Sequence, residues 1–123
     1  MKPIPVAIDF TYLNTLTEGD KAFEQILLKC TIDDIDIKVE DLNSSWKLKN
    51  VSSIRERAHS LVSLFAIAGL PQVEGWSRMI DQKFADGIFH SEMEIYVINS
   101  ISTWAQARIE LKKITSNNLV LQP

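Results

Sequence analysis

The chain has 123 residues, 46% of them hydrophobic, a size at which a single domain buries its own core. Its formal net charge of −3, with Lys and Arg spread among Asp and Glu, argues against a nucleic-acid-binding surface. One cysteine excludes an internal disulfide, and no apolar run approaches the roughly 18 residues of a membrane span. We therefore expect one soluble cytoplasmic domain over residues 1–123, with no targeting segment at Met1 to Pro5 and a buried thiol at Cys30.

Apolar residues recur at helical spacing along most of the chain, and glycine and proline are scarce. The spacing predicts a short helix over Ile8–Leu16 with Asp9 as its N-cap. A second helix, about seven turns long, is predicted to begin after the N-cap Asp20. Its expected core-facing residues are Leu28, Ile32, Ile35, Val39, Leu42 and Trp46. Residues 35–39 also alternate like a strand, but no second strand is available to pair with them.

The next two predicted helices are separated by a glycine-containing turn. The third begins near Asn50 to Ser53, where Ser53 and Glu56 have capping-box spacing, and ends at Gly69. The fourth has Pro71 in its first turn and stops at Gly87. The expected core residues of the third are Ile54, Ala58, Leu61, Phe65 and Ala68, and those of the fourth are Val73, Trp76, Ile80 and Phe84.

The last predicted helix opens at a second capping-box pair, Ser91 and Glu94, and frays at residues 116–118. Its expected core residues are Val97, Ile101, Trp104 and Leu111. Short links between long amphipathic helices favour antiparallel neighbours. The sequence therefore predicts an all-α fold, an antiparallel four-helix up-down bundle with the short first helix across one end.

The sequence contains no clear motif for binding a metal ion or a cofactor. The chain has two histidines, and no Cys or His cluster has zinc-ligand spacing. Glu56 and His59 match the Glu-x-x-His spacing of di-iron bundles, but a second such motif is missing, since His90 has no glutamate three residues earlier. We expect no metal and no cofactor, and we assign no function to His90.

His59 is predicted to point to solvent because it lies roughly 130° from the centre of the apolar face of its helix. The side chains around it form a small, partly apolar patch that suits docking by a protein; they are Arg55, Val62, Ser63 and Ala66. A neutral imidazole is a competent nucleophile towards a phosphoryl group. From helical position alone, a solvated histidine with no role is the commoner case.

Several short motifs point to one family. Ala58-His59-Ser60-Leu61 looks like the Ala-His-x-Leu that opens the phosphorylation motif of histidine-phosphotransfer (HPt) domains. Gly69, ten residues after the histidine, and Val73 are similar to the glycine and the apolar residue of that motif. Residues 8–13 and Gly19-Asp20 resemble the opening helix of the family and the turn that follows it. The chain thus resembles the HPt family over nearly its whole length.

The resemblance implies a phosphocarrier that is not a turnover enzyme. His59 would accept a phosphoryl group from a receiver-domain aspartate and pass it to an aspartate on another receiver, with a hybrid sensor histidine kinase as a further candidate partner. Ser63 would be the small residue that leaves space for the incoming aspartyl phosphate. Val62 stands where the family usually has a lysine, and Leu70 stands where a small residue is common. From its spacing, Arg55 is our candidate for the missing cation.

Two alternatives remain at this point. A degenerate HPt-like module would dock on a receiver or kinase through the same patch without being phosphorylated. A bundle with a purely structural or oligomerisation role would bury a large interface away from His59. For a carrier we expect a monomer with brief encounters, because it must release each partner after transfer.

Overall fold

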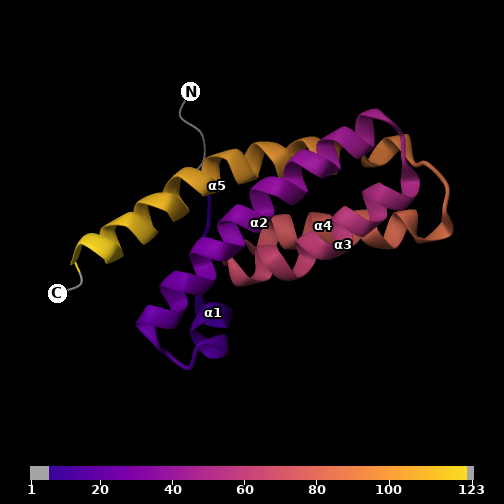
Figure 1. Ribbon diagram of the computed structural model, residues 1–123. Helices are drawn as coiled ribbons and strands as arrows, with labels where there is room; N and C mark the ends of the chain where they lie inside the picture. The colour runs from indigo at the N-terminus through magenta and orange to yellow at the C-terminus, as the bar shows by residue number, and fades with distance from the viewer. Residues whose placement is uncertain (1–5, 122–123) are drawn as a thin grey trace.

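The computed structural model describes residues 6–121, with side chains as far as Ser116, and forms an antiparallel helical bundle (Figure 1). Its helices are α1 (Thr11–Leu16), α2 (Lys21–Lys47), α3 (Val51–Ile67), α4 (Pro71–Lys83) and α5 (Glu94–Leu121), with 3₁₀ turns at Phe84–Asp86 and Ser91–Met93. No strand occurs in this described part of the chain, so the predicted all-α architecture is confirmed. Met1 to Pro5, where we expect no targeting segment, lies outside the described residues.

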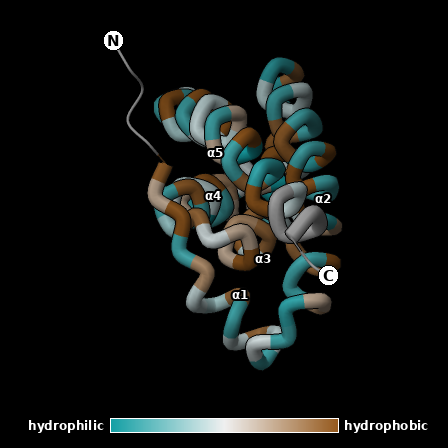
Figure 2. The backbone as a smooth tube through the Cα atoms, turned by 90° about the vertical axis from the view of Figure 1, so that its left-hand side faces the viewer, coloured by the Kyte–Doolittle hydropathy of each residue, from teal (hydrophilic) through white to brown (hydrophobic). Residues whose placement is uncertain are grey.

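The four long helices enclose one core. Each packs on two neighbours, in the cyclic order α2, α3, α4, α5, and Figure 2 shows this arrangement nearly end-on. All six residues predicted to face inward from α2 are buried, as are all five from the third predicted helix. Trp76 and Ile101 are partly buried against the core instead of inside it. The strand alternative for residues 35–39 is excluded, since they lie within α2.

The predicted starts of the first three helices are confirmed in part. Asp20 caps α2 as predicted, since its side chain accepts a hydrogen bond from Phe23 N at 3.1 Å. The third helix starts within the predicted range of Asn50 to Ser53, but its cap is Asn50, whose Oδ1 accepts from Ser53 N, so the capping box at Ser53 is wrong. The first helix begins at Thr11, later than predicted, although the Asp9 carboxylate does accept from Thr11 N. In each case an Asx side chain takes a free N–H of the first turn.

The last helix and the cysteine also differ from expectation. Ser91 opens a 3₁₀ turn without a side-chain cap, and Glu94 instead accepts a hydrogen bond from Trp46 Nε1 at 3.3 Å. The backbone of α5 continues past residues 116–118, where fraying was predicted, to Leu121. Cys30 is exposed on α2 and not buried, because it follows the buried Leu28 by two residues, about 200° of rotation, and so lies on the opposite side of the helix from the core. None of the described helices is both long and apolar enough to cross a bilayer.

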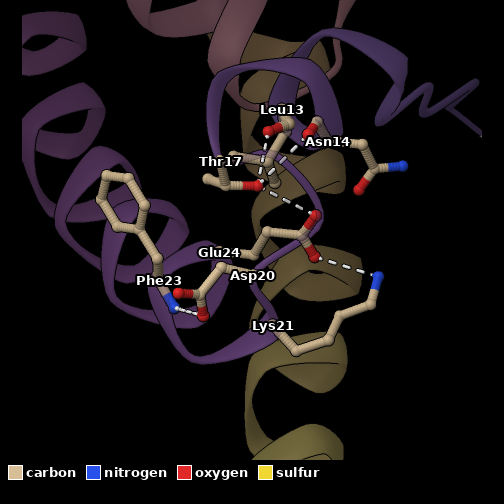
Figure 3. A network of polar contacts seen from close by, with 7 residues as sticks. All are labelled: Leu13, Asn14, Thr17, Asp20, Lys21, Phe23 and Glu24. Atoms are coloured by element: carbon tan, nitrogen blue, oxygen red, sulfur yellow. Dashed lines mark hydrogen bonds and ion pairs between the residues drawn. The ribbon is translucent and has the colours of Figure 1, made fainter.

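The short α1 is fixed to the start of α2 by a polar network (Figure 3). The buried hydroxyl of Thr17 donates to Leu13 O at 2.9 Å and lies 3.1 Å from Glu24 Oε1. Glu24 in turn pairs with Lys21 at 3.2 Å. These contacts hold α1 at the end of the bundle where α3 finishes, as Figure 1 shows.

The chain before α1 is also anchored to the turn between α3 and α4. Asp9 N donates to Gly69 O at 2.8 Å, and a Cβ on Gly69 would lie 2.5 Å from Asp9 O. Gly69 has φ +77°, a conformation that glycine adopts without strain. Hydrogen bonds from the side chain and backbone of Thr11 lower the pKa of Asp9 from its ordinary value of 3.8. This anchor brings the N-terminal segment beside the C-terminal half of α3.

Candidate functional site

His59 lies in the middle of α3, between the buried residues Ala58 and Leu61. Burial of these two neighbours fixes the rotation of the helix and turns His59 outward, as its helical position predicts. The imidazole is 77% exposed. Its ring is therefore accessible to a protein that docks on α3.

Asp81 of α4 orients the ring. Its Oδ2 lies 2.9 Å from His59 Nδ1, and its side chain is only 18% exposed. An ionised carboxylate can only accept a hydrogen bond, so a neutral His59 carries its proton on Nδ1 and leaves the Nε2 lone pair free. The arrangement presents an oriented nitrogen nucleophile at the surface.

Sequence reasoning missed Asp81. It follows His59 by 22 residues and belongs to another helix, so no local spacing relates the two. The usable signal was the turn at Gly69 and Leu70. In an antiparallel helix pair, residues equally far before and after the turn face each other, and His59 and Asp81 are each eleven residues from Leu70.

Arg55 contacts the same carboxylate. Its Nε lies 3.3 Å from Asp81 Oδ1, while its side chain remains 53% exposed. The two residues line an open depression on one flank of His59, together with Val51, Ser52, Phe84 and Gly87. The guanidinium thus contacts the carboxylate that orients His59, and its role beside a phosphoryl group stays a prediction.

On the other flank, a second open depression is shared between α2, α3 and α4. It is lined by His59, Ser60, Ser63, Lys38 of α2 and Arg78 of α4. Ser63 is exposed and its hydroxyl donates to Ser60 O at 3.3 Å. A third depression continues past Val62, Ser63 and Ala66 to Tyr12 and Thr15 of α1. The structure therefore brings the predicted patch residues together and extends the patch onto α1.

The second histidine belongs to the link between α4 and α5. His90 Nε2 lies 2.8 Å from Asp86 Oδ2, and Nδ1 lies 3.4 Å from Glu92 Oε1. A backbone hydrogen bond from Ile88, assisted by His90, lowers the pKa of Asp86 from its ordinary value of 3.8, against the opposing effect of desolvation. His90 thus connects Asp86, at the end of the 3₁₀ turn after α4, with Glu92, in the 3₁₀ turn before α5. Among the described residues, no group of three His, Cys, Asp or Glu side chains is placed to hold a metal ion.

The chain is an antiparallel four-helix bundle with an exposed, oriented histidine in the middle of one helix. We compared this architecture with known proteins. No family model and no curated protein matches the chain. Two solved structures do. Histidine-containing phosphotransfer protein B from Pseudomonas aeruginosa PAO1 shares 17% identity at a TM-score of 0.78, over 89% of this chain and 95% of that one.

The second is the HPT domain of an Hpt sensor hybrid histidine kinase from Shewanella. It shares 13% identity at a TM-score of 0.79, over 89% of this chain and 94% of that one. The chain therefore has the fold of a histidine-phosphotransfer domain.

Proposed function

We propose that this chain is a histidine-containing phosphotransfer protein of a two-component phosphorelay, in which His59 carries the phosphoryl group between receiver-domain aspartates. The observation that carries the proposal is the 2.9 Å contact between His59 Nδ1 and Asp81, which leaves Nε2 free at the surface. The likeness to two structures named for phosphotransfer supports the same class of function. In this role the protein is a carrier and not a turnover enzyme.

The transfer needs little from the carrier itself. The Nε2 lone pair of His59 forms the N–P bond while the P–O bond to the donor aspartate breaks and its electron pair goes to the leaving carboxylate. The Nδ1 proton remains in its hydrogen bond to Asp81, so no separate base has to remove it. The phosphorylated ring is then cationic beside a carboxylate. The reverse steps deliver the group to a second receiver, which supplies the metal ion and the acceptor carboxylate.

Receivers would dock over the patch beside His59. Val62 and Ala66 are partly exposed apolar groups, Ser63 is small, and Tyr12 of α1 is 49% exposed next to them. Small side chains at this position leave room for the phosphorylated aspartate to approach Nε2. We further propose that residues 1–123 form one domain that acts in the cytoplasm as a monomer without a cofactor, through brief encounters with each receiver.

The direct test is phosphorylation of the purified protein by phosphoramidate or by a phosphorylated receiver, followed by intact-mass analysis at neutral and acid pH. We expect an acid-labile gain of one phosphoryl group in the wild type and none in His59→Ala. His90→Ala is the matched control, since it removes the other histidine, and it should gain the group as the wild type does. A folded wild-type protein that gains no mass with either donor would contradict the proposal.

One observation favours a second candidate. Val62 stands one turn after His59, where the resemblance leads us to expect a lysine. A module without that charge could dock on a receiver or kinase without being phosphorylated. In that case His59→Ala would keep both its partner and its cellular effect, whereas a carrier would lose the effect.

A further inference from the structure

Lys38 of α2 faces the same open depression as His59, although the two are 21 residues apart in the chain. It is partly buried, and its neighbours Ile35 and Val39 point into the core. The sequence places it within the second predicted helix and gives no local spacing that relates it to His59. The pairing of α2 with α3 is what brings it to the site.

An ion pair fixes the register of these two helices. Arg57 Nε of α3 lies 3.4 Å from Asp41 Oδ2 of α2. Because α2 and α3 are antiparallel, three residues back along α2 corresponds to three residues forward along α3. Lys38 is therefore level with Ser60, the residue directly after His59.

The other cations near His59 already have carboxylate partners. Arg55 contacts Asp81, and Arg78 lies 2.8 Å from Glu74 with its side chain 54% exposed. Within the described part of the chain, Lys38 has no carboxylate within 4.0 Å, although Asp34, one turn earlier on α2, lines the same depression. A long, flexible ammonium without an ion-pair partner is available to a new anion.

We propose that Lys38 supplies the positive charge beside the phosphoryl group on His59, in place of a lysine at position 62. This inference rests on the proposed function. The phosphoryl oxygens carry nearly two negative charges once the group is on Nε2, and a charge-assisted hydrogen bond from Nζ stabilises them. During transfer the N–P bond forms and the bond from phosphorus to the donor breaks, and the Lys38 ammonium neutralises charge on the oxygens without exchanging a proton.

The test compares phosphoramidate phosphorylation rates of the wild type, Lys38→Met, Lys38→Arg and Lys29→Met. Ammonia leaves phosphoramidate as His59 Nε2 gains the phosphoryl group, so one protein accepts one group without another protein present. Lys29 is the matched control because it lies nine residues earlier on α2, which is half a turn away in rotation at about 100° per residue.

We expect Lys38→Met to react about fivefold more slowly at low salt, as the loss of one partly exposed charge pair predicts. Lys38→Arg and Lys29→Met should react like the wild type. The difference should shrink at 1 M salt, where the screening length is about 3 Å. Titration by ³¹P NMR adds a readout that altered packing would not move, because loss of the ammonium raises the pKa of the second ionisation of the phosphoryl group.

The outcomes separate the two proposals. A wild type that accepts phosphoryl groups while Lys38→Met matches its rate and its ³¹P titration overturns the role of Lys38 alone. A wild type that accepts none overturns the phosphocarrier function and this inference with it. Lys38→Gln, which keeps a polar end, gives the same comparison if Lys38→Met does not fold.

Discussion

Asp81 contacts two residues of α3 at once, His59 through one oxygen and Arg55 through the other. Its side chain is mostly covered by the α3–α4 interface, so its position is set by helix packing. The imidazole it holds is by contrast largely exposed. In the proposed relay Asp81 is a positioning residue, which acts on the phosphoryl group only through the tautomer and orientation of His59.

Replacing Asp81 should slow phosphorylation without removing the nucleophile. We expect Asp81→Ala to accept phosphate from phosphoramidate about tenfold more slowly, the equivalent of one hydrogen bond to a charged group. Asp81→Asn keeps an acceptor oxygen, so its phosphorylation rate should fall by less than that of Asp81→Ala. Nitrogen-15 NMR of the ring should show a larger share of the Nε2–H tautomer in Asp81→Ala, in which the attacking lone pair is blocked.

Arg55→Ala is the control for this prediction because it removes the other partner of Asp81 and leaves the imidazole contact in place. A change within about twofold is expected for a surface ion pair of this kind. A loss as large as that of Asp81→Ala would instead support the role first suggested by spacing, in which Arg55 neutralises the phosphoryl group. Unchanged rate and tautomer ratio in Asp81→Ala would contradict a positioning role.

At the scale of the elements, the turn between α3 and α4 sets the register on which the site depends. Gly69 allows the chain to reverse within two residues, and the Asp9 backbone packs directly on it. The same turn therefore places Asp81 opposite His59 and anchors the segment that leads into α1.

Gly69→Ala should destabilise the fold more than the same change at Gly87. Both glycines have φ near +77°, so each variant carries a backbone cost of about 1 kcal/mol. Only at Gly69 would the new Cβ meet another part of the backbone, at 2.5 Å from Asp9 O. At Gly87 no atom lies within 4 Å of the new Cβ. Urea unfolding should show a loss for Gly69→Ala at least about 1 kcal/mol larger. Equal losses of unfolding free energy in Gly69→Ala and Gly87→Ala would show that the N-terminal segment moves away from the new Cβ at no cost.

At the scale of the whole molecule, the architecture is largely predictable from sequence and the site only in part. Helical spacing correctly predicted the buried residues of α2 and α3, because the apolar face of each helix is buried against the others. The same spacing correctly predicted that His59 points to solvent. Asp81 and Lys38 escaped prediction because their positions depend on the registers of two helix pairs. The wrong capping assignments at Ser53 and Ser91 have other causes. Asn50 accepts the hydrogen bond of the Ser53 backbone N–H, which places Ser53 inside the helix. Ser91 opens a 3₁₀ turn whose start has no side-chain cap.

Acid should remove stability from both ends of the bundle. Asp9 precedes α1, and Asp86 lies in the 3₁₀ turn that follows α4. Figure 1 shows α1 and the link from α4 to α5 at opposite ends of the bundle. Hydrogen bonds lower both pKa values below the ordinary 3.8. A lowered folded pKa gives stability that is fully present above the unfolded value and lost as pH falls through the folded value. The gap in urea midpoint between wild type and Asp9→Asn/Asp86→Asn should therefore be largest at neutral pH and should shrink as the pH falls below 3.8 and through the two lowered pKa values.

Asp33→Asn is the control for this measurement, since Asp33 is exposed and makes no side-chain hydrogen bond among the described residues. It should leave the midpoint unchanged at every pH. A gap for the double variant that persists unchanged in strong acid would show that the two carboxylates act through shape and not through charge.

His59 lies in the interior of a helix with an open depression on each flank, so a donor and an acceptor of receiver size exclude each other from Nε2. In the proposed relay the carrier then follows ping-pong kinetics, and a large excess of unphosphorylated acceptor slows loading by occupying the same surface. Flux through the carrier is limited by the dwell time of each partner. In that role weak binding is an advantage, because every tight complex would take one carrier out of circulation.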